Sequence, residues 1–129
     1  MSIQNVTSAE EFRQLLAANR YVMVDFFATW CPPCKAIAPV FEKLAAEHAA
    51  AGSFAFAKVN VDEAALRPVV SEYRVSAMPT FLCFKEGSLV RVHGEAAIQG
   101  ADPGKLKAAA DKIGGLAKAY KTESEAAAR

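Results

Sequence analysis

The sequence predicts a single α/β domain in which a central mixed β-sheet of four to five strands is flanked by four helices. Residues 21–28 form a nearly continuous apolar segment, which is typical of a strand buried on both faces of a sheet, and residues 54–61 predict a second core strand. Segments with apolar residues three and four positions apart alternate with these strands, as in βαβ units. The chain has 129 residues, which suffices for one hydrophobic core but not for two ordinary domains.

The elements of the first half follow in order. Residues 3–6 predict a short strand, and the capping-box pattern from Thr7 to Glu10 predicts a helix over residues 8–18. The strand at 21–28 comes next, with Asp25 as its one charged residue. A helix is predicted over residues 34–50. Its inward-facing stripe is Ile37, Val40, Phe41, Leu44 and His48.

The second half continues the alternation. After the strand at 54–61, residues 63–73 carry a helical pattern. Strands at 80–84 and 88–92 are predicted to form a hairpin around Glu86-Gly87, and a helix over 103–113 closes the fold. The domain is therefore assigned to residues 1–113, and residues 114–129 form either a helical extension or a solvated tail.

Composition restricts the class of protein. The formal net charge is +1 and the pI is near 7.7, which gives no electrostatic reason to expect nucleic acid or an anionic membrane as a partner. No segment has the length and apolar character of a transmembrane helix. The first twenty residues contain Glu10 and Glu11 and no apolar run, so we expect no secretory signal and a cytoplasmic protein.

The chemistry is concentrated at Cys31 and Cys34, which lie just after the strand at 21–28, where a helix begins. At this spacing the two thiols share one helix face and can form a disulfide or separate. Unpaired N–H groups and the positive end of the helix dipole favour an anion, so we expect the pKa of Cys31 to be lowered and its sulfur to be reachable. Cys34, about one turn deeper, is expected to be more buried and to keep its proton.

Two other interpretations of this pair are open. A structural zinc site needs four ligands, and beyond the pair the chain offers only Cys83, His48 and His93, which form no second ligand cluster. A structural disulfide is disfavoured because the chain has three cysteines and no export signal. Cys83 lies in an apolar run and is predicted to be a buried core thiol. We expect both histidines at the surface and assign them no role.

Several motifs recur in an order that resembles the thioredoxin family from about residue 3 to residue 113. They are Val24-Asp25-Phe26, Ala28-Thr29-Trp30-Cys31, Ala38-Pro39, Lys58-Val59-Asn60-Val61-Asp62, Ala77-Met78-Pro79-Thr80-Phe81, Phe84-Lys85-Glu86-Gly87 and Gly100-Ala101. The resemblance implies the thioredoxin fold and a protein disulfide reductase activity.

The resemblance also implies roles for individual residues. Cys31 would be the nucleophile that forms a mixed disulfide with the target, and Cys34 would resolve it. Asp25, a buried carboxylate with a raised pKa, would accept the proton of Cys34, and Lys58 would modulate that pKa. An outward-facing or merely hydrogen-bonded Asp25 and a plain surface Lys58 remain alternatives.

Target recognition is assigned by the same resemblance to residues around the cysteine pair. A cis bond before Pro79 would leave the Met78 backbone free to pair with an extended target segment. The other members of this set are Trp30, Pro32, Pro33, Gly100 and Ala101. Trp30 would provide a flat apolar flank, with a buried core aromatic as the alternative.

The resemblance implies a chain that binds no cofactor or metal and works through its redox-active Cys31–Cys34 disulfide. The implied partners are a flavoprotein thioredoxin reductase that uses NADPH, and client proteins of the peroxiredoxin, methionine sulfoxide reductase and ribonucleotide reductase classes. The chain is expected to be a monomer that transports electrons between proteins.

The sequence departs from the family pattern at three places. Pro32 stands where most relatives have glycine, Phe27 where many have tryptophan, and residues 92–97 lengthen the last hairpin. Pro-Pro between the cysteines also occurs in tryparedoxins, so a client-specific reductase is one alternative. A non-catalytic binding subunit with the same fold is another.

Overall fold

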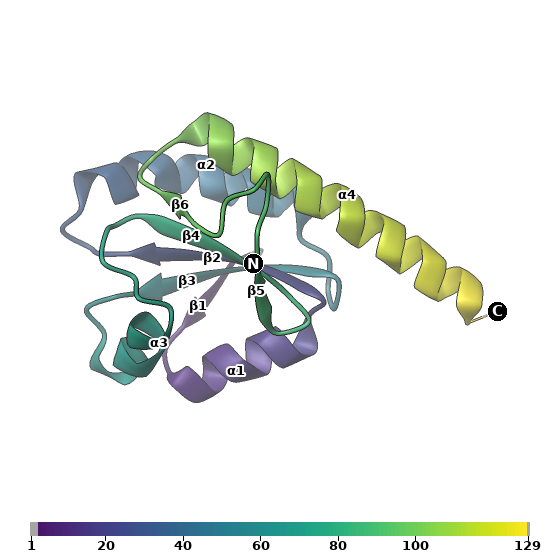
Figure 1. Ribbon diagram of the computed structural model, residues 1–129, viewed down its shortest axis with the longest axis horizontal. Coiled ribbons are helices and arrows are strands. Elements are labelled where there is room, and N and C mark those ends of the chain that lie inside the picture. The colour runs from purple at the N-terminus through teal and green to yellow at the C-terminus, as the bar shows by residue number, and fades with distance from the viewer. Residues whose placement is uncertain (1–2, 129) are drawn as a thin grey trace.

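A computed structural model describes residues 3–128 as a six-stranded mixed sheet covered by helices on both faces (Figure 1). The strands are β1 (Ile3–Val6), β2 (Tyr21–Phe27), β3 (Phe54–Asn60), β4 (Thr80–Lys85), β5 (Ser88–Val90) and β6 (Ile98–Gln99). The helices are α1 (Ala9–Ala18), α2 (Pro32–His48), α3 (Arg67–Glu72) and α4 (Pro103–Ala127), with a 3₁₀ turn η1 (Ala64–Leu66) before α3.

The sheet has the strand order β1-β3-β2-β4-β5, and β6 pairs with β4. The pairs of β3 with β1 and with β2 are parallel, whereas β4 is antiparallel to β2, β5 and β6. The central strand β2 is buried on both faces, as its apolar run predicts. The predicted α/β architecture is confirmed, and the two-residue strand β6 is the element that the sequence did not predict.

Side chains alternate along the strands between two cores. Tyr21 and Met23 of β2 pack with α2 and α4, whereas Val22, Val24 and Phe26 pack with α1 and α3. This alternation follows from the two-residue period of a strand. Figure 1 shows α2 and α4 on one side of the sheet and α1 and α3 on the other.

Local signals set the ends of several elements. Ser8 is the N-cap of α1 and accepts a hydrogen bond from the Glu11 N–H, so the cap begins one residue later than the Thr7–Glu10 pattern predicted. The β4–β5 turn has positive φ at Glu86 and Gly87, the conformation of a type I′ hairpin. Asp102 caps α4 by accepting from the Lys105 N–H.

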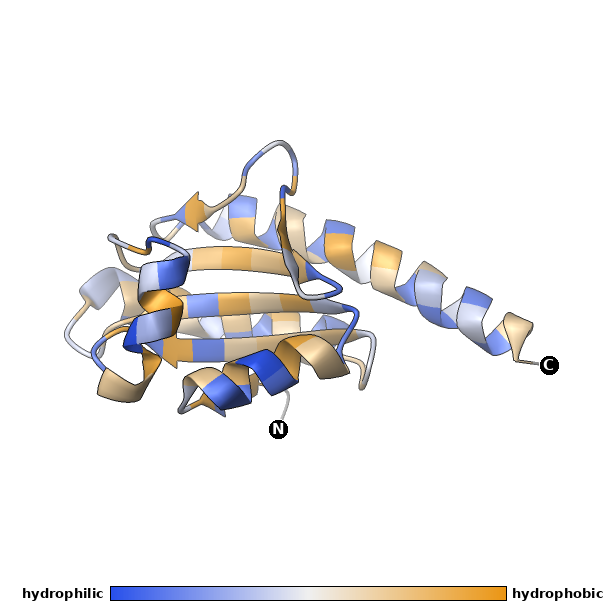
Figure 2. Ribbon diagram, turned by 60° about the horizontal axis from the view of Figure 1, so that its bottom comes forward, coloured by the Kyte–Doolittle hydropathy of each residue, from blue (hydrophilic) through white to orange (hydrophobic). Residues whose placement is uncertain are grey.

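Helix α4 continues without interruption to Ala127, past the end of the predicted domain at residue 113. Its buried residues end at Ala117, and Figure 2 shows a mostly hydrophilic final part that projects beyond the sheet. The residues that the sequence analysis left open between an extension and a tail are therefore helical through Ala127. Among the helices of residues 3–128, none is long and apolar enough to cross a membrane.

Candidate active site at the start of helix α2

The cysteine pair lies at the junction between β2 and α2. Cys31 is the N-cap of α2, with extended backbone angles of φ −92° and ψ 108°, and Cys34 lies in the first turn. The two are joined in a disulfide with Cα atoms 5.2 Å apart. Helix α2 begins at Pro32, whereas the sequence predicted a start at Cys34. Proline is favoured in the first helical turn because an N–H at that position would have no intrahelical acceptor, so its absence costs nothing.

The helix N-terminus directs one hydrogen-bond donor at Cys31. The Cys34 N–H donates to Cys31 Sγ at 3.2 Å. Pro32 and Pro33 occupy the preceding helical positions and have no N–H to offer. An anion on Cys31 would therefore be stabilised by this single amide together with the helix dipole.

The burial of the pair corrects one prediction. Cys31 is 3% exposed and Cys34 is 4% exposed, so the two residues are buried equally in the disulfide form, and Cys31 is much less open than the sequence analysis expected. Burial alone therefore does not distinguish their roles. The difference between them is positional, because Cys31 is the cap that accepts the hydrogen bond and Cys34 supplies it.

The loop before β4 closes over the pair. The Met78–Pro79 peptide bond is cis, and Cys31 Sγ lies 3.6 Å from the Met78 carbonyl oxygen. The Pro79 carbonyl oxygen accepts a hydrogen bond from the Gly100 N–H at 2.8 Å. This bond joins the loop before β4 to the loop that follows β6. Gly100 has a φ of +91°, which favours glycine, and Ala101 beside it is exposed. Three chain segments that are distant in sequence thus meet at the disulfide.

Trp30 is 64% exposed, so the alternative of a core aromatic is wrong. Its indole Nε1–H donates to Asp62 Oδ2 at 2.7 Å, which fixes the ring beside the cysteine pair. The Asp62 N–H donates to Asn60 Oδ1, which orders the chain after β3. Asp62 ends a strand motif of the sequence, and no local signal in the sequence pairs it with Trp30.

Asp25 is fully buried, which excludes the outward-facing alternative. Neither carboxyl oxygen has a hydrogen-bond partner among the described residues. Burial raises the pKa of Asp25 from 3.8 to about 7, although the nearby positive charge of Lys58 acts in the opposite direction. Alternation along β2 places Asp25 on the face of Tyr21 and Met23, which α2 covers.

Lys58 is the register partner of Asp25 on β3, and its side chain is half-buried. The ammonium of Lys58 lies 4.7 Å from the centre of the ring of Phe27, the residue that follows Phe26 on β2. The Asp25 carboxyl makes no hydrogen bond with this ammonium in the described structure. Lys58 therefore acts on Asp25 through space, and a cation–π contact holds its charge nearby.

The third cysteine and the two histidines lie elsewhere. Cys83 is buried in the core between the sheet and α2, as predicted, and burial raises its pKa to about 12. His93 is exposed as expected. His48 is half-buried and bonds to Asp111 on α4, which the sequence did not predict.

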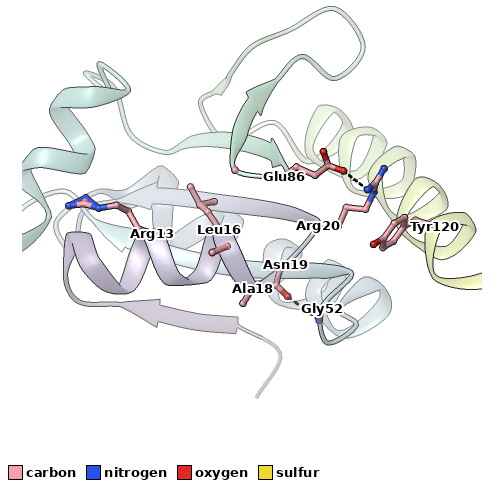
Figure 3. Close-up of a pocket in the computed structure, with 10 residues that line it drawn as sticks. Arg13, Leu16, Ala18, Asn19, Arg20, Gly52, Glu86 and Tyr120 are labelled. Atoms are coloured by element: carbon pink, nitrogen blue, oxygen red, sulfur yellow. Dashed lines mark hydrogen bonds and ion pairs between the residues drawn. The ribbon is translucent and has the colours of Figure 1, made fainter. Parts of the chain in front are cut away.

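A separate hollow of about 680 Å³ lies at the other end of β2 (Figure 3). The Arg20 guanidinium pairs there with Glu86 and stacks 3.9 Å from the centre of the Tyr120 ring. These contacts join the sheet to α4 beyond the core. Because the hollow contains no cysteine or other nucleophile of the predicted site, we interpret it as part of the attachment of α4.

A disulfide at the start of the helix that follows a central buried strand, facing a cis-proline loop, defines a protein disulfide oxidoreductase. The thioredoxin family profile matches residues 3–112 of this chain. The chain belongs to the thioredoxin family.

Named relatives agree with this assignment. The chain is 54% identical over 115 residues to a thioredoxin-like protein of Fusarium culmorum, covering 89% of this chain and 93% of that protein. It is 51% identical over 116 residues to a thioredoxin of Neurospora crassa, covering 90% of each chain. The crystal structure of Malassezia sympodialis thioredoxin superimposes with a TM-score of 0.73 at 38% identity, covering 87% of this chain and 90% of that one. The protein therefore reduces target disulfides by dithiol–disulfide exchange.

Proposed function

We propose that this chain is a general cytoplasmic electron carrier in which Cys31 is the nucleophile and Cys34 the resolving thiol. The observation that carries the proposal is the position of Cys31 as the N-cap of α2, with the Cys34 N–H 3.2 Å from its sulfur. A thiolate at this position is the attacking form and also a good leaving group.

The proposed reaction has two exchange steps. The Cys31 thiolate attacks one sulfur of the target disulfide, so that a Cys31–target bond forms and the other target sulfur leaves as a thiolate, which takes up a proton. Cys34 then loses its proton and attacks Cys31, which forms the Cys31–Cys34 disulfide and releases the second target thiolate. Two electrons pass from the dithiol to the target.

Asp25 is the proposed proton acceptor for Cys34. With a pKa of about 7, a substantial share of this carboxyl is ionised at neutral pH and can take a proton. It lies on the sheet face under α2, the helix whose first turn contains Cys34. Lys58 would modulate its pKa from the adjacent strand, since a nearby cation favours the carboxylate.

The surface around the disulfide is the proposed docking surface for targets. The Met78 N–H makes no hydrogen bond with another residue of the 3–128 range, so it is available to an extended target strand. Trp30, Pro32, Pro33 and Ala101 are exposed around it. Pro79 is buried and, with Gly100, would shape the loop rather than contact the target broadly.

The remaining parts of the proposal concern partners and location. A flavoprotein thioredoxin reductase using NADPH would return the disulfide to the dithiol, and peroxiredoxins, methionine sulfoxide reductases and ribonucleotide reductases would be clients. The near-neutral charge of the chain supports protein partners rather than nucleic acid, and we propose a monomer that works in the cytoplasm.

Reduction of insulin disulfides, followed by turbidity with NADPH and a thioredoxin reductase, tests the proposal. Cys31→Ser should abolish activity, whereas Cys83→Ser, which alters a buried thiol outside the site, should retain it. Cys34→Ser should trap a mixed disulfide with insulin. Full activity in Cys31→Ser would overturn the assignment of the nucleophile.

A further inference from the structure

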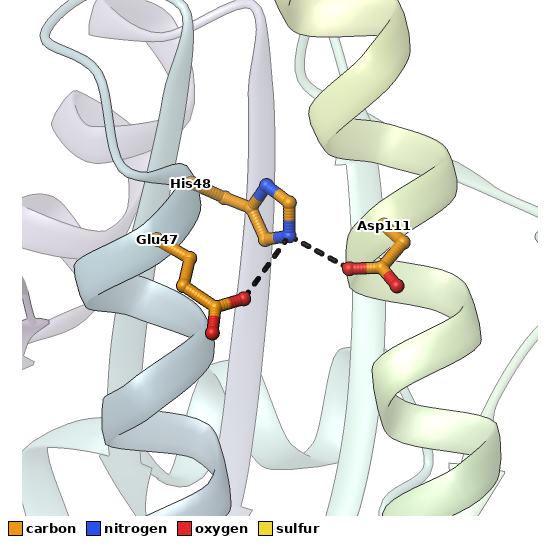
Figure 4. A group of neighbouring side chains, drawn as sticks. All are labelled: Glu47, His48 and Asp111. Atoms are coloured by element: carbon orange, nitrogen blue, oxygen red, sulfur yellow. Dashed lines mark hydrogen bonds and ion pairs between the residues drawn. The ribbon is translucent and has the colours of Figure 1, made fainter.

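A second cluster of polar side chains lies at the opposite end of α2 from the cysteine pair. Glu47 and His48 lie in the last turn of α2, and Asp111 faces them from α4 (Figure 4). His48 Nε2 lies 2.9 Å from Asp111 Oδ1 and 4.0 Å from Glu47 Oε2. One ligand atom from each of the three residues lies within 4.8 Å of the other two.

These distances suit a shared metal ion. A zinc ion bonds to imidazole nitrogen and carboxylate oxygen at about 2.0–2.2 Å, so in tetrahedral coordination two of its ligand atoms lie about 3.4 Å apart. The distances of 2.9 Å and 4.0 Å from His48 Nε2 lie on either side of this value. Glu47 and Asp111 are exposed, and their ligand atoms would need to shift by up to about 1.4 Å to reach it. One imidazole and two carboxylates form a donor set typical of Zn²⁺ and its neighbours, whereas Mg²⁺ and Ca²⁺ take oxygen ligands.

The His48 ring lies directly against Gly114 of α4. A Cβ atom at position 114 would lie 2.3 Å from His48 Nδ1, so only glycine fits against the ring. Glycine inside a helix is unfavourable relative to alanine. The close approach therefore explains a residue that α4 would otherwise disfavour, and it leaves Nε2 directed at the two carboxylates.

The charge of the cluster also suits a cation. Glu47 and Asp111 place two negatively charged carboxylates beside the imidazole ring. Lys107 compensates part of this charge, but it bonds to Oδ2 of Asp111 and leaves Oδ1 on the side of His48.

We propose that Glu47, His48 and Asp111 form a binding site for a divalent transition ion of the Zn²⁺ type, with water completing the coordination. The ion would join the end of α2 to α4. Because α2 has 17 residues and so spans about 25 Å, the ion would lie far from Cys31 and would stabilise the α2–α4 contact without taking part in thiol exchange. The inference does not depend on the proposed function.

Calorimetric titration of the full-length oxidised protein with ZnCl₂ tests the site, since the Cys31–Cys34 disulfide then removes both thiols as competing ligands. We expect saturable binding of one ion, and no binding of MgCl₂ under the same conditions. His48→Gln should weaken Zn²⁺ binding at least tenfold. His93→Gln is the matched control, because it removes the chain's other imidazole, which is exposed in the loop before β6, and it should leave binding unchanged.

Asp111→Asn provides a second variant on an exposed side chain, in case loss of the half-buried imidazole perturbs folding, and we expect about tenfold weaker binding. Zn²⁺ should also raise the melting temperature of the parent protein more than that of His48→Gln. Absence of saturable Zn²⁺ binding, or equal binding by the parent, His48→Gln and Asp111→Asn, would show an ion-pair cluster only and overturn the proposal. Equal activity of parent and His48→Gln in insulin reduction would leave the redox assignment untouched.

Discussion

The amide N–H of Cys34 donates to Cys31 Sγ at 3.2 Å, and the two residues between them are prolines that have no N–H. The first turn of a helix usually offers several free N–H groups to a capping atom, most often those at the second and third helical positions. Here the second position is Pro33, so the sulfur receives one amide where it could receive two.

Pro33→Ala should therefore lower the pKa of Cys31 by restoring an N–H that can face the sulfur. A hydrogen bond to a charged group contributes about 1.5 kcal/mol, which corresponds to roughly tenfold more thiolate below the pKa. The rate of alkylation of the reduced protein across a pH series measures this change. Pro32→Ala is the control, because its N–H at the first helical position points away from the capping atom, and a larger shift in that variant would contradict the explanation.

The buried carboxyl of Asp25 should make stability fall as pH rises. Its pKa is raised from 3.8 in the unfolded chain to about 7, so the folded state binds the proton more tightly and loses this advantage between those pH values. From pH 4 to pH 8, the free energy of unfolding of the parent should fall relative to that of Asp25→Ala by up to about 4 kcal/mol. Urea unfolding of the oxidised proteins measures it. A difference that does not change with pH would refute the raised pKa.

Asp25→Asn should slow the second exchange step. Without a carboxylate to accept its proton, Cys34 attacks the mixed disulfide more slowly, and we expect a loss of roughly tenfold or more near pH 7. Rapid quenching with acid should show the Cys31–target disulfide accumulating in the variant. If activity falls without accumulation of that intermediate, Asp25 acts at another step.

The hydrogen bond from Trp30 to Asp62 should serve target binding rather than thiol reactivity. Asp62→Ala frees the exposed ring, and loss of one hydrogen bond of about 1 kcal/mol predicts a KM about fivefold higher for insulin with kcat nearly unchanged. Glu63→Ala, an exposed neighbour whose side chain makes no capping hydrogen bond, is the matched control. A slower alkylation of Cys31 in Asp62→Ala would point instead to an effect on the thiol.

The stacking of Arg20 on Tyr120 should hold the extension of α4 against the body of the protein. Tyr120→Leu keeps helix propensity but removes the aromatic face. Amide hydrogen exchange should then accelerate in residues 118–127 and remain unchanged in β2 and β3, since local opening of a helix end leaves the sheet intact. Unchanged exchange in α4 would show that Tyr120 does not anchor it.

The elements that the sequence predicted well are those that depend on local pattern. The strand β2 and the alternation of helices and strands could be predicted without knowledge of distant residues. Burial on both faces and helical periodicity are apparent from the order of neighbouring residues. The cysteine pair was found in the same way. Its helix, however, begins at Pro32 because the cap is Cys31 itself.

The sequence did not predict elements of only two residues or contacts between residues that are distant in the chain. Strand β6 has two residues and exists because it pairs with β4, so its own composition carries no signal. The bond between Trp30 and Asp62 spans 32 positions of the chain, and His48 meets Asp111 across 63. Such contacts follow from the way in which helices and strands pack.

The sequence alone determined the fold class and the place of the cysteine pair after a buried strand, because each of these depends on neighbouring residues. Only the tertiary structure decided that both cysteines are equally buried, that the Met78 carbonyl oxygen lies 3.6 Å from Cys31 Sγ across 47 positions, and that the Asp25 carboxyl is buried with no hydrogen-bond partner among residues 3–128. Burial and partnership are properties of the packed chain, since they depend on which distant segments exclude water from a side chain.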